Sequence, residues 1–238
     1  MDSDLRTLAG MQGSLVYLMA GAGPATSRRT VSYHRRLIRA IGAEKPRIAY
    51  IGAAASDSRR FLGFIRDLVF GPDAEVVPVE LTRKVKKTSQ LRAELDLADL
   101  LFFSGGDVEH GMKVVDDRGL APHIRKLAAQ GKAMEGVSAG SIMLGNSWVR
   151  FSDDDDETGE RFACLGVAPF SFDTHAEDDD WDELRALARL LAGSEEKAVY
   201  GIPSGGCAVC RDGAVRALGK PLARFRCGDA RRMADLAV

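Results

Sequence analysis

The sequence predicts an α/β protein: a three-layer sandwich in which helices cover both faces of a mostly parallel central sheet. Five short apolar runs, most of them followed by glycine or polar residues, alternate with amphipathic stretches. Continuous apolar runs are typical of strands buried on both faces, and helical connections between them allow parallel pairing. Because no repeat or long linker divides the chain, we expect one domain over residues 14–238, preceded by a loose polar lead-in at residues 1–13.

The five strands are expected where apolar residues run almost without a break. These runs cover residues 14–20, 47–53, 75–81, 99–104 and 133–137. Helices are expected where apolar residues recur at helical spacing. These stretches cover residues 31–41, 60–70, 121–130, 139–146 and 182–191, and a further helix starts at about residue 108. Gly42 follows the first helix and Gly71-Pro72 follows the second, as stop signals. The Lys/Arg-rich segment up to Leu97 fits either a helix or a loop.

The last third of the sequence departs from this alternation. Residues 149–178 are acidic and rich in loop-forming residues, so we expect them to be irregular. Short strands at 197–202, 208–211 and 215–218 predict a meander around the turn Asp212-Gly213. Cys207 and Cys210 fall on the middle strand, where residues three apart point to opposite faces. We therefore interpret them as buried structural thiols rather than a metal pair or a disulfide.

Composition and charge exclude several classes of partner. The chain has 238 residues, 45% of them hydrophobic, and a net charge of −1, so nothing favours binding to nucleic acid or to an anionic membrane. No apolar run approaches the roughly 18 residues of a membrane span. The segment Met1-Asp2-Ser3-Asp4 lacks the basic and apolar regions of a signal peptide, and the four cysteines are too few for a disulfide scaffold. We expect a cytoplasmic protein with reduced thiols.

The most informative motif is Gly136-Val137-Ser138-Ala139-Gly140, which joins the strand at 133–137 to a helix. A serine at the apex of a tight strand-to-helix turn needs small residues two positions away on each side, and glycine occupies both positions. The pattern predicts Ser138 as a nucleophile whose neighbouring amide, that of Ala139, faces a developing oxyanion. The alternative is an ordinary turn that merely uses glycine and serine.

A second glycine-rich turn, Ser104-Gly105-Gly106-Asp107, follows the strand at 99–104. Sites in open parallel sheets form beyond the carboxyl ends of the strands, and two glycines there let backbone amides approach a ligand. If the two strands are neighbours, the amides of Gly106 and Ala139 form an oxyanion hole. Gly105, Asp107 and the nearby His110 are then candidates for binding substrate, although a plain turn is the simpler interpretation of the two glycines.

A serine nucleophile needs a base, and the sequence offers four histidines. His34 and His123 stand beside arginines in helical stretches, where we expect a solvated surface position. His175 lies in the irregular region after the serine motif and is the best candidate base. The orienting carboxylate stays open at this point, because residues 153–157 form one acidic run and Asp173 stands two residues before His175.

Taken together, three motifs resemble peptidase family S51, the serine peptidases that include aspartyl dipeptidase (peptidase E) and cyanophycinase. The motifs are the Ser138 turn, Phe103-Ser104-Gly105-Gly106-Asp107 and Asp173-Thr174-His175, and the resemblance runs from about Gly13 to Gly228. It implies the class I glutamine amidotransferase-like (flavodoxin-like) fold. It also implies the order Ser, Asp, His with intervals like the 15 and 37 residues that separate Ser138 from Asp153 and His175. Asp153 is thereby selected from the acidic run, although Asp154 is its neighbour.

The sequence also departs from this family around the substrate. His110 or Val108 replaces a glutamine that follows the glycine turn in relatives, and Ser204 stands where many relatives carry glutamate. Cyanophycinase-like members have a basic stretch after the histidine, whereas here it is Ala176-Glu177-Asp178-Asp179-Asp180. We therefore expect a pocket unlike that of either named enzyme, with acidic side chains that disfavour an N-terminal aspartate and favour a free or basic amino terminus.

These observations predict a serine hydrolase that cleaves a small peptide or amide through an acyl-enzyme. In this hypothesis Ser138 attacks, His175 transfers the proton and Asp153 orients the imidazole. We expect no cofactor and no metal, no nucleic-acid or membrane partner, and a sequence compatible with a homodimer. Two alternatives stay open: a catalytically silent protein that binds a small ligand in the same cleft, and an esterase with the same triad.

Overall fold

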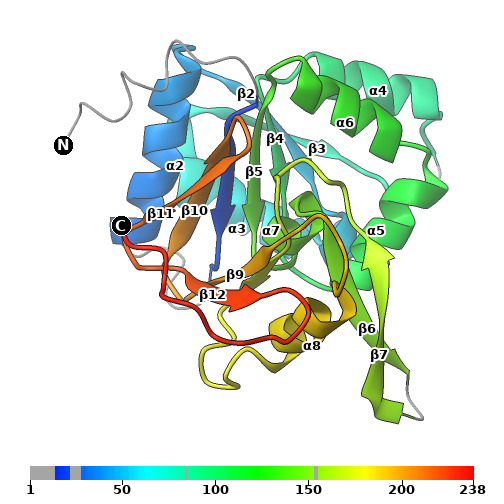
Figure 1. Cartoon of the computed structure of the whole chain (residues 1–238). Helices are drawn as coiled ribbons and strands as arrows, with labels where there is room; N and C mark the ends of the chain where they lie inside the picture. The colour runs from blue at the N-terminus through cyan, green and yellow to red at the C-terminus, as the bar shows by residue number, and fades with distance from the viewer. Residues whose placement is uncertain (1–13, 22–27, 84, 153–154) are drawn as a thin grey trace.

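The centre of the molecule is a seven-stranded sheet, seen in a computed structural model that describes residues 14–21, 28–83, 85–152 and 155–238 (Figure 1). Five neighbouring strands are parallel: β1 (Val16–Met19), β5 (Ala133–Val137), β4 (Leu100–Phe103), β2 (Arg47–Ile51) and β3 (Glu75–Val79). Two antiparallel strands, β10 (Cys207–Arg211) and β11 (Ala214–Leu218), extend the sheet beyond β1. The predicted mostly parallel sheet is confirmed.

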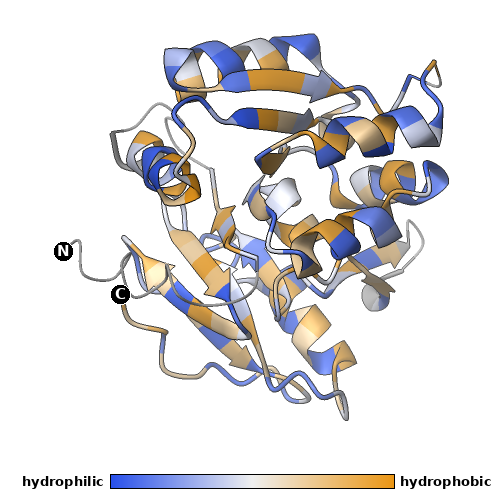
Figure 2. Ribbon diagram, turned by 90° about the horizontal axis from the view of Figure 1, so that it is seen from above, coloured by the Kyte–Doolittle hydropathy of each residue, from blue (hydrophilic) through white to orange (hydrophobic). Residues whose placement is uncertain are grey.

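Helices cover both faces of this sheet, which gives the three predicted layers. One face packs against α2 (Arg28–Ile41), α3 (Arg59–Phe64) and the π-helical turn η2 (Ile65–Phe70). The other face and its surroundings carry α4 (Thr88–Asp96), α5 (Val108–Asp117), α6 (Ala121–Ala129), α7 (Ala139–Leu144) and α8 (Asp182–Leu190). Short 3-10 turns stand at Ala53–Ala55 (η1) and Gly71–Asp73 (η3). Most helices mix hydrophobic and hydrophilic residues along their length (Figure 2), whereas every residue of α7 is buried.

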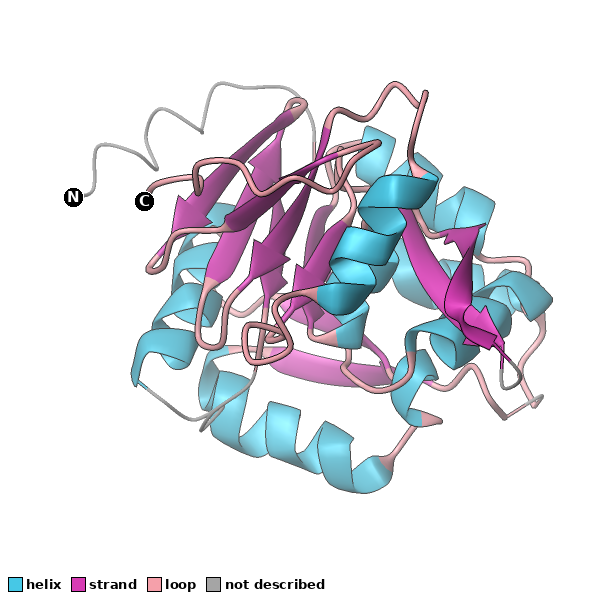
Figure 3. Cartoon of the chain, turned by 60° about the horizontal axis from the view of Figure 1, so that its bottom comes forward, coloured by secondary structure: helices cyan, strands magenta, loops and turns pink. Residues whose placement is uncertain are grey.

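The segment 149–178, expected to be irregular, contains regular structure. Strands β6 (Ser147–Ser152) and β7 (Asp155–Ala163) form an antiparallel hairpin that lies against α8 and projects from the body (Figures 1 and 3). Strand β8 (Phe172–Thr174) follows. The acidic composition misled the interpretation, because one face of an antiparallel hairpin can meet solvent and carry charged residues.

The predicted meander is also wrong, because its three strands belong to two sheets. Strand β9 (Ala198–Ile202) lies between β8, to which it is parallel, and β12 (Ala223–Arg226) in a separate three-stranded sheet. Strands β10 and β11 form the expected hairpin, with both Asp212 and Gly213 at positive φ in its turn. Strand propensity identified the segments, but it contains no information about which partner each strand takes.

The cysteines of β10 point to opposite faces, as the spacing predicts. Cys207 belongs to the core beneath α2, and Cys210 belongs to the core on the other face. Burial raises the pKa of both thiols, which keeps them protonated and unreactive. Among the residues that the structure describes, no helix is long and apolar enough to cross a membrane.

Candidate active site

Ser138 occupies a strained turn between β5 and α7. Its backbone has φ 54° and ψ −124°, a conformation that a non-glycine residue adopts only under constraint. The two flanking glycines explain how the turn is packed. A Cβ on Gly136 would lie 2.6 Å from the backbone of Gly140, and a Cβ on Gly140 would lie 2.1 Å from the carbonyl oxygen of Phe103. Only glycine fits at either position, as the motif predicts, and the turn is held rigidly against β4.

His175 meets Ser138 from the other sheet. The Oγ of Ser138 lies 2.8 Å from the Nε2 of His175, within hydrogen-bond distance. His175 follows β8 directly, has φ 48° and donates its backbone amide to the carbonyl oxygen of Ile202 at 2.9 Å. Its side chain is exposed, whereas Ser138 is partly buried. A hydroxyl hydrogen-bonded to an imidazole is the arrangement that activates a serine nucleophile.

The glycine turn after β4 lies beside the serine because β4 and β5 are adjacent parallel strands. A Cβ on Gly105 would lie 3.2 Å from the Cβ of Ser138, so glycine leaves room there for a ligand. Gly106 has φ 143°, and a Cβ on it would lie 2.0 Å from the carbonyl oxygen of Ala54. Within the described ranges, neither the amide of Gly106 nor that of Ala139 has a hydrogen-bond acceptor, which leaves both available to an oxyanion.

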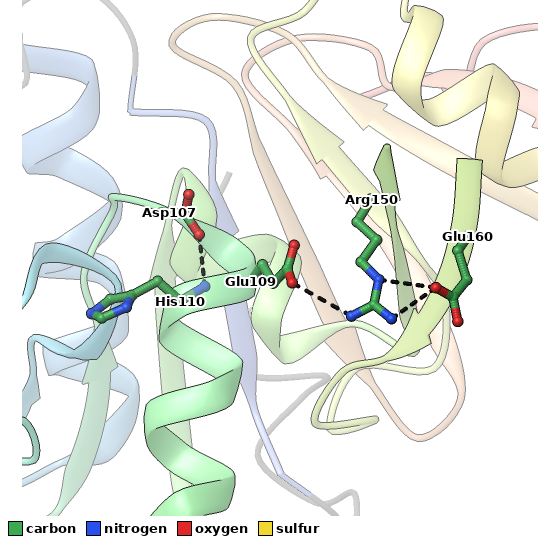
Figure 4. A network of polar contacts seen from close by, with 5 residues as sticks. All are labelled: Asp107, Glu109, His110, Arg150 and Glu160. Carbon is green, nitrogen blue, oxygen red and sulfur yellow. Dashed lines mark hydrogen bonds and ion pairs between the residues drawn. The ribbon is translucent and has the colours of Figure 1, made fainter. Parts of the chain in front are cut away.

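Asp107 and His110 have local structural contacts. Asp107 caps α5, its Oδ1 accepting the amide of His110 at 2.7 Å (Figure 4). The ring of His110 lies 3.1 Å from the Oγ of Ser56, and the neighbouring Glu109 pairs with Arg150 of the hairpin at 3.4 Å. Asp107 and His110 are not among the described residues that line the cavity beside Ser138, whereas Gly105 is.

The orienting carboxylate expected for His175 falls at Asp153, which, with Asp154, lies outside the described residues. Among the described residues, none accepts a hydrogen bond from the Nδ1 of His175. Asp173, the other candidate of the sequence, is buried and its Oδ1 accepts the amide of Thr174 at 2.6 Å. Burial raises the pKa of Asp173 to about 7. The carboxyl group of Asp173 is thus buried away from water, and no hydrogen bond joins it to the described atoms of His175.

A cavity of about 540 Å³ opens beside Ser138 and His175. Part of its wall is aromatic and aliphatic, formed by Phe61, Phe64, Ile65 and Val69 of α3 and η2. None of its described lining residues is Asp, Glu, Lys or Arg. The volume falls within the range of about 300 to 1,000 Å³ that small-ligand sites occupy.

His34 also lines this cavity, and here the sequence interpretation was wrong. His34 is 2% exposed rather than solvated, and its Nδ1 contacts the Oε1 of Glu135, a strand β5 residue that is 0% exposed. The histidine ring packs edge-on against Phe70, with 5.2 Å between centroids. His123, expected at the surface, is 13% exposed and contacts Asp96 at 2.8 Å. A glutamate inside an apolar strand was the available signal, because a buried carboxylate requires a partner.

The metal-ligating side chains of the described residues do not form a cluster. In the part of the chain that the structure describes, no group of three or more His, Cys, Asp or Glu side chains could hold a metal ion. The absence of a metal from the reaction stays a prediction.

The α/β fold, which places the serine turn and the histidine at the carboxyl edge of its parallel sheet, is shared with known structures. The structure is similar to a peptidase from an acI-B1 Actinobacterium, with a TM-score of 0.69, 18% identity and coverage of 95% of this chain and 96% of that one. It is also similar to a provisionally assigned peptidase E protein from Listeria monocytogenes EGD-e, with a TM-score of 0.64, 13% identity and coverage of 87% and 98%. At these identities the likeness shows the fold alone.

The sequence matches peptidase family S51 over residues 16–218. The chain belongs to this family and is a serine peptidase. No curated protein matches the sequence. The resemblance that the motifs predict is thus confirmed at the level of the family, and a peptide substrate follows from it.

Proposed function

We propose that the chain hydrolyses a small peptide or amide with Ser138 as nucleophile and His175 as general base and acid. The observation that carries this proposal is the 2.8 Å separation of Ser138 Oγ and His175 Nε2 at the open end of the parallel sheet. His175 Nε2 takes the hydroxyl proton while Oγ attacks the carbonyl carbon. The C–N bond then breaks, and the same proton passes to the leaving amine.

The tetrahedral intermediate carries its negative charge on the former carbonyl oxygen. We assign its stabilisation to the amides of Gly106 and Ala139, which come from adjacent strand ends and lack other described acceptors. One such donor typically accounts for about 10² to 10³ in rate. Water then attacks the acyl-enzyme, with His175 removing its proton, and releases the carboxylic acid and free Ser138. Gly105 has no side chain and so leaves room for this oxygen beside Ser138. Asp107 and His110 contribute indirectly, because their hydrogen bond caps the N-terminus of α5.

Asp153 is proposed as the group that orients the imidazole through Nδ1, by the family spacing, with Asp154 as the alternative. No described residue accepts a hydrogen bond from the Nδ1 of His175, which supports an acceptor outside the described residues. Such a carboxylate holds the ring in the tautomer whose Nε2 accepts the serine proton, and it stabilises the imidazolium that results.

The test is covalent labelling with a fluorophosphonate probe, followed by mass spectrometry of the labelled peptide. We expect one label on Ser138 in the wild type and none in Ser138→Ala, which should also lose nearly all hydrolysis because members of such a site act as a unit. Ser141→Ala is the matched control, because the buried Ser141 Oγ donates to the carbonyl of Met19 at 2.9 Å. Turnover by pure Ser138→Ala within about tenfold of wild type would exclude the mechanism.

A further inference from the structure

The cavity beside Ser138 contains two kinds of surface that together select a substrate. Its outer wall is the apolar surface of Phe61, Phe64, Ile65 and Val69, and the rings of Phe61 and Phe64 lie 6.2 Å apart in a stacked arrangement. His34 contributes the imidazole that contacts Glu135. A group bound here is thus surrounded mainly by carbon. Its described polar neighbours are the imidazoles of His34 and His175 and the hydroxyls of Ser58 and Ser138.

Acidic side chains are disfavoured in this cavity by its charge. The Nδ1 of His34 already contacts Glu135, whose carboxyl group is completely buried behind the imidazole. No Lys or Arg is found among the described lining residues. Among the described lining residues, a substrate carboxylate would lose its hydration without a cation to replace it, which is costly in a low-dielectric site.

Basic side chains also lack a partner. Glu135 is already in contact with His34 and has no exposed surface, so a substrate ammonium cannot reach it directly. The acidic residues after His175 do not line the cavity: Glu177 accepts the amide of Ser204 at 2.9 Å, and Asp180 pairs with Arg185 at 2.6 Å. The cavity wall therefore does not support the predicted preference for a basic amino terminus.

We propose that this cavity is the specificity pocket of the peptidase and takes a bulky apolar side chain, such as that of Phe, Leu or Met. The scissile carbonyl must lie against Ser138, so the side chain of the residue that carries this carbonyl is the nearest group to enter the pocket. Burying that side chain against Phe64 and Val69 stabilises the complex in proportion to the apolar area removed from water. This inference rests on Ser138 being the nucleophile.

The first experiment compares kcat/KM for the dipeptides Phe-Gly, Leu-Gly, Ala-Gly, Asp-Gly and Lys-Gly. Phe-Gly and Leu-Gly should exceed Asp-Gly and Lys-Gly by more than about tenfold, the size of discrimination that an apolar pocket supplies. Phe64→Ala should lower kcat/KM for Phe-Gly about tenfold and leave that for Ala-Gly nearly unchanged. The matched control is Leu62→Ala on the same helix, because Leu62 does not line this cavity.

A second measurement does not depend on turnover. Phenylethyl boronic acid and carboxyethyl boronic acid compete with fluorophosphonate labelling of Ser138, and the phenyl compound should protect at a concentration at least tenfold lower. Normal labelling together with a tenfold preference for Asp-Gly would overturn the apolar pocket and leave the proposed mechanism standing. Absence of both labelling and hydrolysis would overturn the mechanism and, with it, this inference.

Discussion

Ser138 and His175 meet at hydrogen-bond distance, but two differently built regions hold them. Ser138 belongs to the middle of the seven-stranded sheet, where Gly136 and Gly140 pack backbone against backbone. His175 ends an edge strand of the three-stranded sheet, and its side chain is exposed. Close packing of the core therefore fixes Ser138, the proposed nucleophile. His175, the proposed base, is held by the backbone hydrogen bond from its amide to the carbonyl oxygen of Ile202.

The sharpest test of this comparison is the base itself. His175→Gln keeps a polar side chain of similar length but cannot exchange a proton near neutral pH, so kcat should fall by about 10⁴ or more. Stability should change little, because the side chain is exposed. Steady-state kinetics and urea unfolding measure the two effects. A variant that unfolds in parallel with its loss of activity would show that His175 has a structural role in its region.

The orienting carboxylate should have the next largest effect. Asp153→Asn should lower kcat by about 10³ to 10⁴, because an amide at this position favours the wrong imidazole tautomer. Asp155→Asn and Asp156→Asn serve as neighbouring controls with small expected effects. A large loss in Asp154→Asn with a small one in Asp153→Asn would move the assignment by one residue. Small losses in all four would remove the acidic run from the site.

Packing of the nucleophile is tested by adding one methyl group. Gly140→Ala places a Cβ 2.1 Å from the Phe103 carbonyl oxygen, so β4 and the turn must separate. We expect a loss of at least about 3 kcal/mol in the free energy of unfolding. The control is Gly205, in the turn between β9 and β10, which has φ 70° and no atom within 4 Å of an added Cβ. Gly205→Ala should cost about 1 to 2 kcal/mol from backbone conformation alone. Equal losses of unfolding free energy in the two variants would contradict the idea that the Ser138 turn is packed more tightly than the turn at Gly205.

The last test concerns stability alone and uses Asp173, a buried carboxyl group two residues before His175. Its raised pKa, about 7, means that the folded protein holds this proton more tightly than the unfolded chain does. The folded state binds more protons between about pH 4 and 7, so this group lowers stability as pH rises through that window, and the loss is complete above it.

Asp173→Asn removes the buried charge while keeping the shape and an acceptor for the Thr174 amide. The variant should be more stable than wild type by about 3 to 4 kcal/mol at pH 8, because the pKa is raised by about three and each pKa difference of one is worth about 1.4 kcal/mol. The gain should shrink toward zero near pH 4. Urea titrations at both pH values measure it, and a gain independent of pH would show that Asp173 does not titrate in this window.

Several features were determined by the sequence alone, because they depend on neighbours along the chain. Apolar runs placed the five parallel strands, and the spacing of two glycines around Ser138 placed the strained turn. The same local reasoning selected His175, which the structure places at hydrogen-bond distance from Ser138, and the Gly105-Gly106 turn, which lies beside the serine. Steric limits at a tight turn act over a few residues, so a motif of five residues carries them completely.

Other features were decided only by the tertiary structure. The sequence places His34 among arginines in a helix, yet the helix turns it toward the sheet, where Glu135 of strand β5 contacts it. Strand β9 looks like its neighbour β10 in composition, yet the two joined different sheets. Burial and strand pairing depend on contacts between distant parts of the chain, such as His34 with Glu135 and β1 with β10, and no local pattern contains them. The charge balance of the cavity beside Ser138 is a consequence of such contacts.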